Sequence, residues 1–124
     1  MKANELRIGN IVEFSTPKLP LNIHELSHIV TAEDIVNFEN GKILLTPVPL
    51  TEEWLKKLGF KYSEERASMS NGFEEWENNG VYIGPLDNEK YVCDALDQGG
   101  ISMYILYVHQ LQNLYFALTG QELI

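Results

Sequence analysis

Residues 107–120 read YVHQLQNLYFALTG, and this stretch decides the fold class more than any other part of the chain. At about 100° per residue, a helix over residues 107–119 has one apolar face. That face holds Tyr107, Val108, Leu111, Leu114, Tyr115 and Leu118. Gly120 follows at the position where glycine commonly ends a helix. Because an apolar helix face must be buried, we expect this helix to pack on a sheet formed by the rest of the chain.

The opposite face of this helix is polar, but it holds one aromatic residue. Its members include His109, Gln110, Gln112, Asn113 and Phe116. An aromatic side chain within a polar stripe indicates that this side is also covered. We therefore expect His109, Gln112, Asn113 and Phe116 to form an interaction face for a protein partner or a second copy of the chain. In the alternative interpretation, Gln110, Gln112 and Asn113 hydrogen-bond backbone groups at neighbouring strand edges.

Working outward, a second and shorter helix is expected over Thr51–Leu58. Thr51 is a typical N-cap, and glutamates at 52 and 53 suit the positive end of the helix dipole. Lysines at 56 and 57 suit the negative end, and Gly59 can adopt the left-handed conformation that closes a helix. These caps matter because isolated helices of this length are marginal.

The remaining chain is dominated by strand signals separated by turns. The expected strands are Leu6–Phe14, bent at Gly9, then Lys42–Thr46, Phe73–Glu77, Val81–Ile83, Lys90–Ala95 and Ile101–Leu106. Together these signals predict one α+β domain over residues 1–124. Its expected architecture is a bent antiparallel sheet, open or partly barrel-like, with two or three helices packed on it.

Two segments fit more than one structure. Residues 23–30 fit a helix and a strand about equally well. Residues 31–39 favour a short helix, because Thr31 can cap it and Asp34 occupies the third helical position. The competing interpretation is a strand Asp34–Phe38 that runs into an Asn-Gly hairpin.

The segment His24-Glu25-Leu26-Ser27-His28 spells H-E-x-x-H, the pattern of zinc peptidases. On a helix, His24 and His28 share one face and can bind one Zn²⁺, with Glu25 as base for a bound water. On a strand the two histidines stand about 13 Å apart, too far for one ion. No spacing announces a third ligand. We therefore expect no metal site, no cofactor and no catalytic residues, and keep a zinc-dependent hydrolase as an alternative.

The charge balance excludes some classes of partner. The chain has 9 Lys and Arg against 18 Asp and Glu, a formal net charge of −9. Such a chain is poorly suited to phosphate backbones or to anionic membrane surfaces. It suits a basic protein partner, and it permits an acidic decoy that occupies a nucleic-acid-binding protein. Glu74, Glu75 and Glu77, beside Trp76, are the candidate acidic recognition surface, with a solvated strand face as the plain alternative.

Other features give expectations of location and redox state. Cys93 is the single cysteine, so it cannot form an internal disulfide, and its strand-like setting predicts a buried thiol. No apolar stretch has the length of a signal-peptide core or a membrane span, so a cytoplasmic location is expected.

Three stretches, NELRIGN (4–10), PVPLTEEWLKKLGF (47–60) and VHQLQNLYFALTGQEL (108–123), together carry a family resemblance. They resemble a family of small proteins of gut Bacteroides-type bacteria and their phages or mobile elements, for which no activity is established. Members commonly have Pro-Ile-Pro where this chain has Pro47-Val48-Pro49. The resemblance implies a phage or prophage setting, and it does not include the H-E-x-x-H segment. The expected function is a non-enzymatic accessory role exerted by protein–protein contact.

Overall fold

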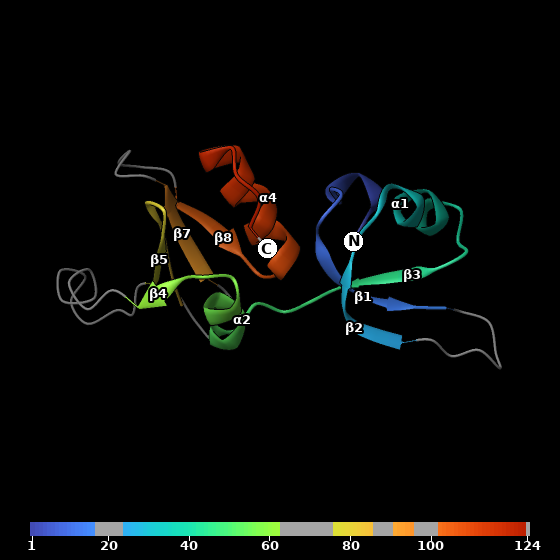
Figure 1. Cartoon of the computed structure of the whole chain (residues 1–124), viewed down its shortest axis with the longest axis horizontal. Helices are drawn as coiled ribbons and strands as arrows, with labels where there is room; N and C mark the ends of the chain where they lie inside the picture. The colour runs from blue at the N-terminus through green and yellow to red at the C-terminus, as the bar shows by residue number, and fades with distance from the viewer. Residues whose placement is uncertain (17–23, 63–75, 86–90, 96–101, 124) are drawn as a thin grey trace.

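The computed structural model describes residues 1–16, 24–62, 76–85, 91–95 and 102–123, and Figure 1 shows their arrangement. The elements in chain order are η1 (Ala3–Glu5), β1 (Ile11–Ser15), β2 (His24–Ile29), α1 (Ala32–Glu39), β3 (Leu44–Pro47), α2 (Glu52–Lys57), β4 (Lys61–Tyr62), β5 (Trp76–Asn78), β6 (Val81–Pro85), β7 (Tyr91–Ala95), β8 (Ser102–Ile105) and α4 (Val108–Thr119). The strands pair antiparallel throughout, and helices accompany each sheet, so the predicted α+β class is confirmed. Within the described ranges, no helix has the length and apolar character needed to cross a membrane.

The N-terminal half contains a three-stranded sheet with β1 in the centre, in the order β2-β1-β3. It lies on the right of Figure 1 together with η1 and α1. A small apolar cluster fills it, made of Leu6, Val12, Val30, Ile43 and Leu45. Phe14, Ile35 and Phe38 pack against this cluster and remain partly exposed. The half therefore has a core of its own, but a small one.

The C-terminal half contains a five-stranded meander in the order β4-β5-β6-β7-β8. Helices α2 and α4 lie beside it in Figure 1. Its apolar cluster is larger and includes the buried residues Leu55, Ile83, Val108, Leu111 and Tyr115, with Leu114 and Leu118 packed against it. The predicted apolar face of the C-terminal helix is thus the face that meets this core.

The two shorter helices begin where their caps predict. At α2, the Thr51 hydroxyl accepts a hydrogen bond from the Trp54 amide at 3.3 Å, and Gly59 takes a left-handed φ of +87°. At α1, the Thr31 hydroxyl accepts from the Asp34 amide at 3.2 Å, and the Asp34 carboxylate accepts from the Thr31 amide at 2.9 Å. The helix interpretation of residues 31–39 is confirmed, and the competing hairpin is wrong. Residues 24–29 form a strand.

The sheet expected as one bent sheet is instead two sheets, and neither closes into a barrel in the part of the chain that the structure describes. The division falls just after β3. Because proline has no N–H to donate, Pro47 and Pro49 cannot continue a regular ladder. The chain leaves the first sheet there and pairs with the segment that enters α4. The Leu50 amide donates to the Leu106 carbonyl at 3.0 Å, and the Val108 amide donates to the Val48 carbonyl at 2.9 Å.

Candidate functional site

The candidate site is the side of α4 that faces away from the five-stranded sheet. Figure 1 shows α4 between the two halves, with the start of the chain beside it. Residues 109, 112, 113 and 116 fall along this side because helical neighbours recur at three and four positions. Gln112 and Asn113 belong to an amide network, His109 and Asn113 line a pocket, and Phe116 lies at the solvent edge.

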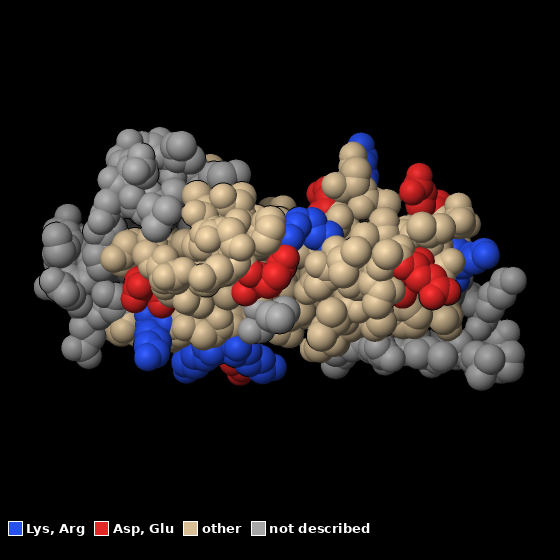
Figure 2. Space-filling model, turned by 45° about the horizontal axis from the view of Figure 1, so that its top comes forward, with Lys and Arg blue, Asp and Glu red and all other residues tan. Residues whose placement is uncertain are grey.

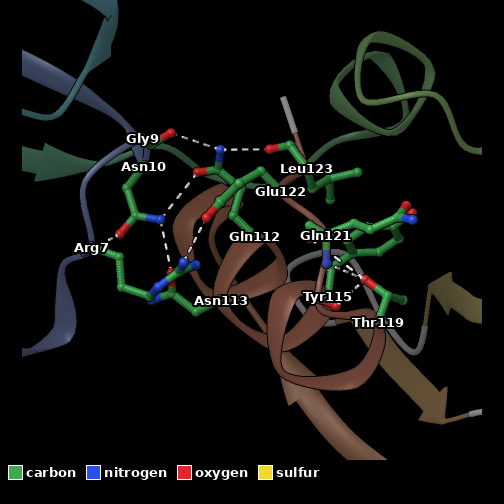
Figure 3. Close-up of polar contacts among 10 residues, drawn as sticks. All are labelled: Arg7, Gly9, Asn10, Gln112, Asn113, Tyr115, Thr119, Gln121, Glu122 and Leu123. Carbon is green, nitrogen blue, oxygen red and sulfur yellow. Dashed lines mark hydrogen bonds and ion pairs between the residues drawn. The ribbon is translucent and has the colours of Figure 1, made fainter.

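Gln112 is the centre of the amide network and is only 2% exposed. Its Oε1 accepts from the Ile11 amide at 2.7 Å. Its Nε2 donates to the carbonyl oxygens of Gly9, at 3.1 Å, and Leu123, at 2.9 Å. Figure 3 shows the contacts from Gln112 to Gly9 and Leu123. Gln112 therefore joins the entrance of β1, the middle of α4 and the segment that follows α4.

Asn10 and Asn113 extend this network. Asn10 is 1% exposed, and its Nδ2 donates to Asn113 Oδ1 at 2.8 Å. Asn113 Nδ2 in turn donates to the Glu5 carbonyl at 2.9 Å, while Asn10 Oδ1 accepts from the Arg7 amide at 2.6 Å. Each amide thus has complementary neighbours, as buried polar groups require.

Phe116 lies at the solvent edge of the same side and is 37% exposed. The Arg7 guanidinium lies 3.9 Å from the centre of its ring, a cation–π contact. Arg7 also pairs with Glu122 at 2.7 Å (Figure 3). One face of the Phe116 ring is therefore covered from within the chain.

His109 differs from its neighbours because it is 2% exposed and neither ring nitrogen has a hydrogen-bond partner among the described residues. Its ring stacks on that of Tyr107, with centroids 6.0 Å apart. Burial lowers the pKa of His109; the Glu5 carboxylate opposes this shift, and the N-terminal ammonium adds to it. The imidazole is therefore neutral at pH 7, with one nitrogen able to accept a hydrogen bond and one able to donate.

A pocket of about 460 Å³ opens beside this imidazole. Both halves of the molecule contribute to its wall. The lining residues are Asn4, Glu5, Tyr104, Ile105, His109, Gln110, Asn113 and Leu114. Its volume lies in the range of small-molecule and side-chain sites, and it combines apolar walls with a few polar groups.

The structure thus separates the residues that the sequence grouped together. Gln112 and Asn113 bond inside the chain, and Gln110 Oε1 accepts from the Leu106 and Tyr107 amides at 2.9 and 3.2 Å. The alternative interpretation is confirmed in that these amides bond backbone groups, but the expected strand edges are wrong, because Ile11 of the central strand β1 is the one strand residue among their partners. Phe116 reaches solvent and remains available to a partner, whereas His109 borders a pocket but is itself buried.

Sequence reasoning missed three residues of this region. Asn10 follows the expected bend at Gly9 and carried no prediction of its own, although an asparagine at a strand entrance can bond across to another element. Arg7 and Tyr104 carried no pattern of their own. Their positions depend on how η1 and β8 approach α4, which no local signal announces.

The H-E-x-x-H segment lies on strand β2, not on a helix. Residues four apart on a strand are about 13 Å apart, so the geometry on which the zinc interpretation depended is missing. His28 Nε2 lies 2.7 Å from Asp34 Oδ2, and its ring centroid lies 4.7 Å from that of Phe14. His28 therefore ties β2 to the start of α1. The side chains of His24 and Glu25 lie outside the described residues.

The predicted acidic surface is described only at one residue. Glu74 and Glu75 lie outside the described residues. Glu77 Oε1 accepts from the Gly80 amide at 3.1 Å, so this carboxylate stabilises the turn between β5 and β6. Cys93 lies in β7, opposite Ile83 and Met103, and its side chain is also outside the described residues.

No family model matches the chain, and no curated protein and no solved structure matches it either.

Proposed function

We propose that this protein is a non-enzymatic accessory protein that acts by contact with another protein, through the pocket where α4, β8 and η1 meet. One observation carries the proposal: Tyr104, 66% exposed, lines the same pocket as the buried, unpaired imidazole of His109. Tyrosine is enriched at protein interfaces because it offers a large apolar surface and a polar end. A pocket beside such a residue is the common form of an interface hot spot.

The charge of the chain favours a basic partner. A net charge of −9 steers cationic proteins toward the surface and repels acidic ones. A cytoplasmic phage or prophage setting, which the resemblance of the three sequence stretches implies, is part of this proposal.

The test compares variants in partner capture and in self-association. Tyr104→Asp and Phe116→Asp place a charge at the proposed surface, and Val36→Asp places one on α1, at a residue 56% exposed. Proteins retained by the wild type and Val36→Asp, but lost with Tyr104→Asp, support the proposal. Sedimentation of the same variants reports on contact between two copies. Equal retention by all folded variants, with unchanged sedimentation, contradicts it.

A second candidate is an acidic decoy for a basic host protein, favoured by the same charge of −9. Figure 2 shows one face of the molecule. Over the described residues of that face, the acidic side chains form separate small groups with basic side chains among them. The two candidates make opposite predictions for Tyr104→Asp. An added carboxylate removes a contact surface but leaves a decoy intact, and a decoy loses its partner steeply as salt increases.

A further inference from the structure

Strand β8 forms one edge of the five-stranded sheet, because it is the last strand in the order β4-β5-β6-β7-β8. In Figure 1 it is the strand of this sheet that lies nearest to the N-terminal half. No strand in the described part of the chain pairs with its outer side. An edge strand keeps a row of backbone N–H and C=O groups that can pair with another chain.

The pocket beside α4 lies along this edge and not over a face of the sheet. Tyr104 and Ile105 are consecutive in β8, and both line the pocket. Consecutive strand residues point to opposite faces, and accordingly Ile105 is 3% exposed in the core whereas Tyr104 is 66% exposed. Two such residues border the same pocket where the pocket meets the backbone between them. The lining across from them includes Asn4 and Glu5 of η1.

The hydrogen bonds of Leu106 identify the backbone groups that point to this edge. The Leu106 carbonyl accepts from the Leu50 amide at 3.0 Å, and the Leu106 amide donates to Gln110 Oε1 at 2.9 Å. Neither partner belongs to β7, so both bonds lie on the outer side of the strand. Because alternate strand residues direct their backbone groups to the same edge, the N–H and C=O of Tyr104 share this direction. No described residue bonds them from that side.

These open groups fit an extended peptide segment. One donor and one acceptor on the same residue are what a neighbouring strand pairs with. The chain already pairs in this way one step along the same edge, at the antiparallel bridge between Pro49 and Tyr107. The Glu5 carboxylate lies in the pocket lining and favours lysine or arginine in the segment, while Leu114 offers apolar surface to one of its side chains.

We infer that an extended segment of the partner protein adds to β8 as a further strand, with its backbone bonded to the N–H and C=O of Tyr104. This pairing rests on the proposed function, because it states how the partner occupies the pocket. Backbone hydrogen bonds supply the affinity of such a contact, and side chains that reach Leu114 and Glu5 supply its selectivity.

The first test measures the open edge in the full chain without a ligand. By the same alternation, the amides of Met103 and Ile105 face β7. Hydrogen exchange followed by NMR is therefore expected to be at least about tenfold faster at the Tyr104 amide than at these two amides. Equal protection of all three amides shows that the edge is not open and overturns the inference.

The second test adds a peptide probe, acetyl-Lys-Val-Thr-Val-Lys-amide, which combines strand-forming residues with two positive charges. A saturable shift and slower exchange of the Tyr104 amide are expected at millimolar peptide. The matched control carries methyl groups on two successive central amides, which blocks both edges of the peptide. It is expected to bind at least about tenfold more weakly. No saturable binding of the probe, or equal binding of the two peptides, overturns strand pairing.

Two variants isolate the backbone donor from the aromatic side chain. Tyr104→Ala and Tyr104→Pro both lack the ring, and only Tyr104→Pro also lacks the N–H. Proline is accepted in an edge strand where the lost N–H faces outward, so the pairing of β7 with β8 should persist. Tyr104→Pro is expected to bind the probe several-fold more weakly than Tyr104→Ala. Equal binding overturns the inference, and so does loss of the β7–β8 pairing, because the N–H then faces β7.

The outcomes distinguish this inference from the proposed function. Loss of partner capture with Tyr104→Asp, together with equal capture by Tyr104→Pro and Tyr104→Ala, contradicts the inference alone. Probe binding with partner capture unchanged by Tyr104→Asp contradicts the proposed function instead. If the wild type sediments as a dimer that Tyr104→Pro dissociates, the edge pairs with a second copy of the chain, and the assignment to a partner segment is overturned.

Discussion

The two halves of the molecule bury apolar residues on very different scales. Among the described residues, the cluster of the N-terminal half has five buried members and that of the C-terminal half has fifteen. A small core supplies little free energy against the chain entropy lost on folding. We therefore expect the N-terminal half to depend for its stability on its attachment to α4, and the C-terminal half to depend on that attachment less.

Strand β1 connects the two halves. Consecutive residues of a strand point to opposite faces. Val12 accordingly belongs to the small cluster, whereas Ile11 belongs to the large one. The Ile11 amide is also the donor to Gln112. One strand thus takes part in both cores and in the amide network between them.

The largest expected effect comes from a substitution in the core of the C-terminal half. Leu111 is fully buried on α4, and Leu111→Ala is expected to lower the free energy of unfolding by about 3 kcal/mol. Because α4 supports the smaller half, amide exchange should accelerate in β1 and β3 as well as in β6. Val12→Ala, in the small core, is expected to accelerate exchange in β1 and β3 far more than in β6. Denaturant unfolding and hydrogen exchange of both variants measure this, and unchanged exchange in β3 for Leu111→Ala contradicts the dependence.

The second effect comes from a substitution in the amide network that joins the two halves. Gln112→Ala leaves the Ile11 amide and the Gly9 and Leu123 carbonyls without their partner, and is expected to destabilise the fold by about 2 kcal/mol. The matched control is Glu122→Gln, which alters a contact between the same halves at the surface, where side-chain exposures are 31% and 45%. That control is expected to change stability by less than about 0.5 kcal/mol. If chemical denaturation shows that the two variants are destabilised equally, the amide network is not the main polar connection between the halves.

The smallest effect lies wholly within the N-terminal half and depends on pH. Burial alone would raise the pKa of Asp34, but hydrogen bonds from His28 and from the Thr31 backbone and side chain outweigh burial and lower it from its usual 3.8. The unfolded state therefore takes up the proton first, so this stabilisation is present at neutral pH and is lost as pH falls through the folded-state pKa.

Asp34→Asn is accordingly expected to destabilise the protein by about 1 kcal/mol at neutral pH. The difference from the wild type should shrink as both are acidified below the ordinary range of aspartate. Urea unfolding over an acid pH series measures it, and Glu33→Gln, an exposed carboxylate of the same helical turn, serves as control. If the difference in stability between Asp34→Asn and the wild type persists at the lowest pH, the stabilisation does not come from the ionised Asp34 carboxylate.

Much of the local structure was predictable because local chemistry produces it. Helix α4 follows from apolar residues spaced by three and four positions, and its end follows from Gly120, which takes a φ of +73°. Helices α1 and α2 follow from Thr31 and Thr51 with their acidic first turns. Each of these signals lies within a few residues of what it determines.

The site was predictable only in its location. The polar stripe of α4 correctly marked a covered surface, but Gln112 and Phe116 look alike in sequence as members of that stripe. Gln112 is buried because Gly9 and Ile11 lie opposite it, whereas Phe116 stays partly exposed with the Arg7 guanidinium against its ring. These contacts join residues about a hundred positions apart, as the separation of Ile11 and Gln112 by 101 positions illustrates.

The sequence by itself determined the α+β class, the three helices with their caps, and the acidic character of the surface, because each follows from side-chain period, capping chemistry or simple charge. Only the tertiary structure decided that the strands form two sheets, that β2 is a strand, and that His109 lies unpaired beside a pocket. Packing between distant segments sets these features, and it depends on the burial of whole faces, which no local pattern specifies.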